Sequence, residues 1–325
     1  MDSSTPNFLS KTTLAVLLIC LSACSNDTKT KDDQTSTTQQ STPPLQTSLK
    51  PNKALDLFVA HANTAFDTLN LSAKRLRKAT SIFLDKPSDQ QLEICKKELA
   101  QTHLDYMATH LYRNTLVLAK IEHPELDRNL LLPEIIHSNN FRLDKHPIIP
   151  GYIDSVDGYP SSGLIFSEQA LSADFLNNEH QFSDEAYVTL GFHSLGYLLL
   201  GGEKETQRDA NSFKSLKHPK SLQPEYRRSI YTRLLVETII EDINLLSQAW
   251  ASQSGYYQLA LKELSTAQFM TLIELAIKFE ENELPKLGQQ SKEGMHYLSH
   301  ESKKAANSRQ DELDSLQAAL LPEHP

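Results

Sequence analysis

Apolar residues recur at steps of three and four over most of this chain, which is the period of an amphipathic α-helix. The first run begins near residue 54, and further runs begin near residues 88, 183 and 265 and at residue 224. A more polar run covers residues 292–321. The apolar stripe of the first run consists of Leu55, Phe58, Ala62, Ala65, Leu69, Ala73 and Leu76. The pattern therefore predicts a series of helices.

Two of these predicted helices carry start signals in the sequence. Ser88 and Gln91, and again Ser265 and Gln268, have the spacing of a capping box, in which each side chain bonds a backbone amide of the other residue. The stripe that follows Ser88 mixes apolar and polar side chains, and it consists of Leu92, Cys95, Leu99, His103, Tyr106 and His110. Both segments are expected to be long helices.

The helical pattern breaks between residues 121 and 166. This stretch holds Pro124, Pro133, Pro147, Pro150 and Pro160, and no strand-like alternation replaces the helical period. Glycine is scarce, with 10 in 325 residues, yet seven of the ten fall between residues 151 and 202. We expect an all-α fold of two helical-bundle halves, 53–166 with the central loop and 167–325, joined by this irregular Pro/Gly-rich centre.

The N-terminus resembles an export signal followed by a membrane anchor. The apolar run 14–21 is too short to span a bilayer and suits a secretory signal over residues 1–23. Residues 21–24 (LSAC) resemble the lipobox of bacterial lipoproteins, which implies acylation of Cys24, and Ser25 resembles their outer-membrane sorting pattern. An ordinary signal cleaved near Ala23 would instead release the protein.

Residues 24–52 contain the anchoring cysteine and a segment of Ser, Thr, Gln, Asp and Lys with little to bury. As a flexible tether it would reach about 30 Å. We therefore expect a protein of the bacterial cell envelope, held by lipid at the outer membrane and facing the periplasm.

Charge and cysteine content narrow the partners. The formal net charge is −9 without a dense basic cluster, which argues against nucleic acid. Cys95 is the one cysteine of the predicted body, so that body has no internal disulfide. Because Cys95 lies on the apolar stripe, a buried structural thiol is expected there rather than a nucleophile.

Two segments carry a family resemblance. Residues 151–163 (GYIDSVDGYPSSG) and 188–202 (VTLGFHSLGYLLLGG) together resemble the imelysin family, in which such a loop leads to a helix with a GxHxxE signature. The resemblance implies an all-α fold of two bundle-like halves over the chain from about residue 53. It also implies an envelope protein connected with bacterial iron uptake, in a family that is named as peptidases as well.

The signature is incomplete here. Gly191, His193 and Gly196 occupy its three marked positions, so glycine replaces the glutamate that would share a metal with the histidine. His193 is then either a ligand of iron or another divalent metal, or a hydrogen-bonded histidine of the core. Gly196 indicates either that a neighbouring group packs closely on the helix or that the position has drifted.

Further candidates cannot be ranked from the sequence. Tyr159, Ser161, Ser162 and Asp157 could line a polar ligand pocket beside His193, although this segment also has ordinary turn chemistry. The carboxylates that could replace the missing glutamate are Asp154, Asp184, Glu185, Glu237 and Glu241, for which backbone bonding, helix capping or a solvated charged face are the simpler explanations. The remaining histidines of interest are His103, His110, His296 and His300.

The sequence favours binding over catalysis. It contains no HExxH pair, no G-x-S-x-G elbow and no glycine-rich phosphate loop. Three hypotheses follow. The first is a lipid-anchored protein that binds a metal, a metal carrier or a partner protein of the envelope during iron acquisition. The second is a metallopeptidase-like enzyme, and the third is a docking scaffold that has lost metal binding.

Overall fold

The structure is a computed structural model that describes residues 51–123, 142–202, 207–217, 222–251, 255–287 and 302–320. The predicted signal peptide, Cys24, and His296 and His300 lie outside these residues, as does the tether up to residue 50. Residues 47–325 group into one compact unit.

The described residues are helical and form no β-sheet, which confirms the predicted all-α class. The long helices are α1 (Pro51–Asp85), α2 (Asp89–Ala108), α3 (His110–Glu122), α8 (Pro224–Trp250), α10 (Thr266–Leu287) and α11 (Ser302–Leu320). The shorter ones are α5 (Pro150–Ile153), α6 (Ala173–Glu179), α7 (Gly191–Leu200) and α9 (Tyr256–Leu261), with 3₁₀ turns η2 (Leu164–Phe166) and η4 (Ala210–Ser212).

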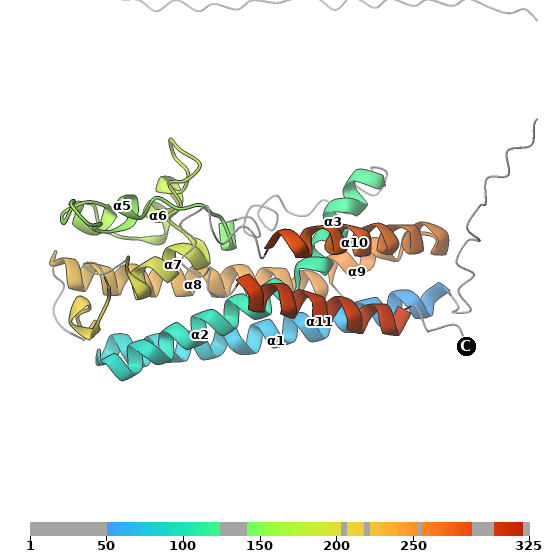
Figure 1. The fold of residues 1–325 in the computed structure, drawn as a ribbon, viewed down its shortest axis with the longest axis horizontal. Helices are drawn as coiled ribbons and strands as arrows, with labels where there is room; N and C mark the ends of the chain where they lie inside the picture. Colours follow the sequence, from blue (N-terminus) through green and yellow to red (C-terminus); the bar gives the residue numbers. More distant parts are fainter. Residues whose placement is uncertain are drawn as a thin grey trace, which may run out of the picture. The chain divides into compact units, whose positions relative to one another are not determined.

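Helix α1 is the centre of the packing. It lies beside α2 and packs along α8, so helices from the first and second halves of the chain share one core (Figure 1). Its apolar stripe meets an aromatic cluster in which the rings of Phe66 and Trp250 stack at 5.9 Å and the edge of Tyr112 meets Phe58 at 5.2 Å. Helix α7 packs against both α8 and α2 and is almost wholly buried.

Both predicted capping boxes lie at helix starts. The Ser88 hydroxyl accepts the amide of Gln91 ahead of α2, and Ser265 and Gln268 bond each other's amides ahead of α10. The stripe predicted to continue through His110 on one helix is interrupted, because the chain leaves the helix at Thr109. The Thr109 hydroxyl donates to the carbonyl of Tyr106 (2.7 Å), and such local side-chain bonding competes with the helical ladder.

The helix predicted from residue 183 begins eight residues later, at Gly191. Residues 187–190 are extended because Thr189 bonds outside the local chain: its hydroxyl donates to the carbonyl of Leu176 (2.7 Å) and its amide to Nδ1 of His180 (3.2 Å). Asp184, expected in a first helical turn, instead accepts the amide of Ala186 in a turn. The apolar positions therefore repeat at helical spacing for several residues before the helix itself begins.

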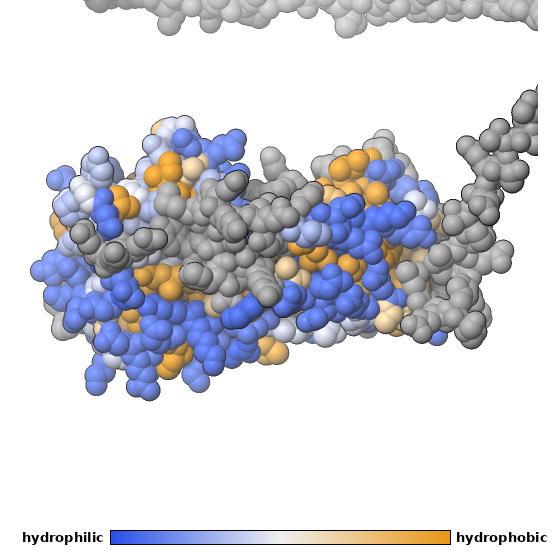
Figure 2. All heavy atoms as spheres, in the orientation of Figure 1, coloured by the Kyte–Doolittle hydropathy of each residue, from blue (hydrophilic) through white to orange (hydrophobic). Residues whose placement is uncertain are grey.

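The surface is mostly hydrophilic on the face shown in Figure 2, as expected when most apolar side chains pack in the core. On the face in Figure 2, hydrophobic residues form separate patches between hydrophilic ones. Among the described residues, no helix is both long enough and apolar enough to cross a bilayer.

A buried carboxylate joins three helices away from α7. Glu280 of α10 accepts from the His110 ring of α3 and from the Arg309 guanidinium of α11, whose Nε lies 2.9 Å from Oε2. Since Glu280 and Arg309 are 1 % and 5 % exposed, each neutralises a charge that would otherwise be buried alone. The His110 ring therefore has a structural partner in Glu280.

Candidate functional site

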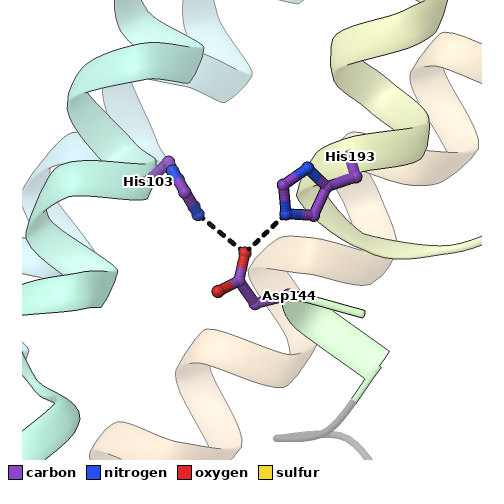
Figure 3. Close-up of side chains that lie close together, drawn as sticks. All are labelled: His103, Asp144 and His193. Carbon is purple, nitrogen blue, oxygen red and sulfur yellow. Dashed lines mark hydrogen bonds and ion pairs between the residues drawn. The ribbon is translucent and has the colours of Figure 1, made fainter. Parts of the chain in front are cut away.

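Three side chains from separate elements meet at one point. His103 of α2 and His193 of α7 both direct Nε2 at Oδ1 of Asp144, at 2.7 and 3.0 Å (Figure 3). Asp144 belongs to the irregular segment that precedes α5. Two imidazole nitrogens and one carboxylate oxygen, all within 4.8 Å of one another, form a possible metal-binding group.

The position of His193 follows from how α7 is held. The Thr189 carbonyl accepts the hydroxyl of Tyr231 from α8 (2.7 Å), and the Thr189 amide is bound by His180. Burial lowers the pKa of His180 to about 4, so its ring is neutral near pH 7 and Nδ1 remains an acceptor. Because Thr189 is fixed in this way just before α7, the helix presents His193 inward, with 3 % of the residue exposed.

The position of Asp144 depends on an ion pair two residues earlier in the chain. The Arg142 guanidinium donates both Nε and Nη2 to the carboxylate of Asp242 on α8, at 2.7 and 2.6 Å, and Nη1 to Asn177 (2.7 Å). Asp242 is 1 % exposed, and burial raises its pKa to about 6 against the opposing effect of Arg142. This bidentate contact fixes the segment that carries Asp144.

Gly191 allows that segment to approach α7. Its φ is +88°, and a Cβ placed there would lie 2.2 Å from the carbonyl oxygen of Arg142 and 2.6 Å from that of Leu143. Any side chain at this position would displace the backbone next to Asp144. The first glycine of the motif therefore has a direct structural role in the site.

The directions of the pKa shifts of Asp144 and His193 favour the forms of these two groups that bind metal. Burial alone would raise the pKa of Asp144, but the charge and hydrogen bonds of His103 and then His193 hold it well below the ordinary value. Burial lowers the pKa of His193, and the hydrogen bond and charge of Asp144 act against that shift without reversing it. A carboxylate and a neutral imidazole are the forms that bind metal.

Hydrogen bonds among the three residues do not satisfy every buried polar atom of the triad. Nδ1 of His103 is buried and has no hydrogen-bond partner among the described residues, an arrangement that costs about 1–3 kcal/mol. The Asp144 side chain is 20 % exposed, against 7 % and 4 % for the two imidazoles, so the carboxylate connects the buried nitrogens with solvent. The residues present thus fit a divalent ion in chemistry and in access.

The family model described as Imelysin matches residues 62–321, about four fifths of the chain. The chain belongs to the imelysin family. No curated protein matches it. Membership of this family suggests a secreted or envelope protein.

In this imelysin-family chain, a carboxylate from elsewhere stands beside the motif histidine. Gly196 stands where the GxHxxE resemblance implies a glutamate, while Asp144, more than 40 residues earlier in the chain, hydrogen-bonds His193. Gly196 itself is buried, as the interpretation of a closely packed neighbour requires. No pattern in the sequence singles out Asp144, and His103 is only one member of a stripe that mixes apolar and polar side chains.

The motif loop meets α7 one turn beyond His193. The Tyr197 hydroxyl donates to the carbonyl of Ser155 (2.5 Å), whereas Asp157, Tyr159 and Ser161 are exposed, Tyr159 by 70 %. The Ser162 hydroxyl donates to the carbonyl of Tyr159 (2.9 Å), as expected of turn chemistry. A ligand-binding role for Asp157, Tyr159, Ser161 and Ser162 stays a prediction.

Asp154 of the same loop is fully buried, and its carboxylate holds the loop in place. Its carboxylate binds the Arg228 guanidinium (Nη2 to Oδ1, 3.0 Å) and that of Arg208 (Nη2 to Oδ2, 2.9 Å), and Oδ1 also accepts the amide of Ser155 (2.7 Å). Only the amide bond follows from the sequence, since the two arginines come from distant segments. These contacts attach the loop to α8 and to the stretch before η4.

The other carboxylates considered from the sequence face solvent. Asp184, Glu185 and Glu241 are exposed, and Glu237 lies 4.0 Å from Arg233 one turn away on α8, with 45 % of its side chain exposed. The solvated charged face therefore holds for Glu237 and Glu241, whereas the helix capping expected of Asp184 and Glu185 is wrong, because α7 begins only at Gly191.

Gly191→Ala tests whether close packing at α7 positions Asp144. A positive φ together with the 2.2 Å approach predicts a loss of at least about 2 kcal/mol in the free energy of unfolding, measured by chemical denaturation. Gly151→Ala is the matched control, because a Cβ there meets Val156 at an ordinary 3.5 Å and should change stability by no more than about 1 kcal/mol. Equal effects of the two changes would contradict this account of the motif glycine.

Proposed function

We propose that this imelysin-family protein binds a divalent metal ion between His103, Asp144 and His193, and that the ion is iron taken up as cargo during iron acquisition. The observation that carries the proposal is the convergence of two buried imidazoles on one carboxylate oxygen. Two histidines and one carboxylate form a donor set typical of Fe²⁺ and also of Zn²⁺. The family resemblance favours iron.

The bound ion would provide a site of positive charge for a carrier or a partner protein. The chain's own groups do the binding: His103 and His193 supply nitrogen from rigid helices, and Asp144 supplies the charge that offsets the ion. The Arg142–Asp242 pair keeps Asp144 in place, so the site is largely organised before an ion arrives.

The cellular setting is the second part of the proposal. Lipid on Cys24 would hold the protein at the outer membrane, facing the periplasm, and the tether would let the helical body stand away from the lipid. The lipobox resemblance and family membership support export. Several acyl chains on one residue give stable anchoring, which a single chain does not.

A metallopeptidase-like activity is the second candidate. Two histidines and a carboxylate are also the ligands of catalytic zinc in several peptidases, and the matched family carries a peptidase name. Binding is preferred because the chain has no HExxH arrangement to supply a base next to the metal. A docking scaffold without metal remains the third.

Metal titration of the full-length protein tests the proposal. Under anaerobic conditions, wild type should retain about one Fe²⁺ or Zn²⁺ per chain, and His193→Ala should lower the affinity by well over about tenfold because a ligand is lost. His61→Ala is the control: that imidazole only approaches Glu312, at 3.8 Å, and its loss should leave binding unchanged.

Three other outcomes would contradict metal uptake as the function. If wild type retains no ion, the scaffold hypothesis gains support. If His193→Ala binds as well as wild type, the ion lies elsewhere. If a peptide mixture is cleaved in a metal-dependent reaction that His193→Ala abolishes, the protein is the enzyme of the second candidate.

Cys24→Ser tests the anchor separately. In a bacterial host fed labelled palmitate, wild type should carry the label and sediment with membranes, whereas Cys24→Ser should carry none, because the acylated thiol is gone. Cys20→Ser, inside the apolar run, should still be labelled. Label retained by Cys24→Ser would show that the lipobox resemblance is misleading.

A further inference from the structure

A third imidazole lies beside the His103–Asp144–His193 triad. His146 is two residues from Asp144, and its ring centroid lies 5.0 Å from that of His193, closer than the 5.7 Å between His103 and His193. Two imidazoles bound to one tetrahedral ion, with metal–nitrogen distances near 2.1 Å, have centroids about 5 Å apart. The ring spacing is thus that of ligands of a common ion, but no nitrogen of His146 belongs to the group of ligand atoms that lie within 4.8 Å of one another, so this ring has to shift toward an ion to bind it.

A hydrogen bond decides which nitrogen of His146 carries the lone pair of the neutral ring. Nδ1 lies 2.9 Å from the carbonyl oxygen of Asp144. A carbonyl only accepts, so Nδ1 carries the proton and the lone pair of the neutral ring is on Nε2. Metal-binding histidines commonly use such a bond from the other ring nitrogen to a carbonyl to fix tautomer and orientation. Asp144 therefore orients His146 through its backbone while its carboxylate contacts the other two rings.

We propose that Nε2 of His146 is a fourth ligand, which makes the site three nitrogens and one oxygen. This rests on the proposed metal binding at the triad and adds the class of ion and the kind of site. A donor set dominated by imidazole selects borderline divalent transition ions, such as Zn²⁺, Co²⁺ and Fe²⁺, over the oxygen-preferring Mg²⁺ and Ca²⁺.

Four protein ligands have a consequence for function. Catalytic zinc sites keep one coordination position for water or substrate, whereas sites that only hold the ion fill all four positions with protein. With His146 bound, a tetrahedral ion here has no open position. His146 is partly exposed and belongs to the same segment as Asp144, on the more accessible side of the site, so it closes over an ion already held by the deeper His103 and His193.

The experiment uses Co²⁺ as a spectroscopic probe and Zn²⁺ for affinity, on the full-length protein. Wild type with Co²⁺ should give the intense visible absorption of four-coordinate cobalt, and a large excess of Mg²⁺ or Ca²⁺ should leave it unchanged. His146→Ala should give the weaker spectrum of an ion that has gained water, with Zn²⁺ affinity lower by about tenfold or more. Added free imidazole should restore the wild-type spectrum.

Two further variants separate ligation from positioning. His146→Asn keeps an N–H that can donate to the Asp144 carbonyl but removes Nε2, so it should behave as His146→Ala does, and it serves as a second test if the alanine variant folds poorly. Lys145→Ala, in the adjacent position of the same segment, should behave as wild type.

The outcomes distinguish this inference from the proposed function. If His146→Ala or His146→Asn matches wild type in spectrum and affinity while His193→Ala loses the ion, the triad binds metal alone and His146 is no ligand. If Mg²⁺ or Ca²⁺ displaces Co²⁺ from wild type, the assigned class of ion is wrong. If wild type binds neither Co²⁺ nor Zn²⁺, the proposed function falls and this inference with it.

Discussion

The hydrogen bonds from two buried imidazoles to one oxygen of Asp144 are the constraint on which the site depends. Histidines 90 positions apart in the chain must reach the same atom, so α2, α7 and the segment before α5 have to converge within hydrogen-bond distance. Separate contacts enforce this. Thr189 fixes the start of α7, Arg142 and Asp242 fix the segment of Asp144, and α2 and α7 pack directly on one another. Little reorganisation is left for a binding event to supply.

This arrangement gives the altered motif a physical interpretation. The GxHxxE resemblance implies an acid one turn from the histidine on the same helix, where helical geometry alone brings the pair together. Here Gly196 removes that acid, and the carboxylate beside His193 comes from another element. Such a carboxylate must be held by tertiary contacts, and Gly191 and the ion pair of Arg142 supply them. An acid therefore lies next to His193 although α7 itself carries none one turn away.

The helical period and the capping boxes were sufficient to predict the class of fold and most long helices, because both are local properties. The helical period does not predict the break at Thr109 or the late start of α7. Hydrogen bonds of the Thr109 and Thr189 side chains decide where these helices end and begin. For the site, the motif identified His193. His103 looked like one more member of a buried stripe, and Asp144 lies in a proline-rich segment without a period. The place of Asp144 depends on the ion pair between Arg142 and Asp242, which lie a hundred residues apart, and no local pattern encodes such a contact.

The most direct test of this account is a crystal structure of the iron- or zinc-loaded protein, with the ion located by anomalous scattering at its absorption edge. The account predicts one strong peak about 2.0–2.2 Å from Nε2 of His103, Nε2 of His193 and a carboxylate oxygen of Asp144. A peak at any other position, with the two imidazoles still hydrogen-bonded to Asp144, would contradict it.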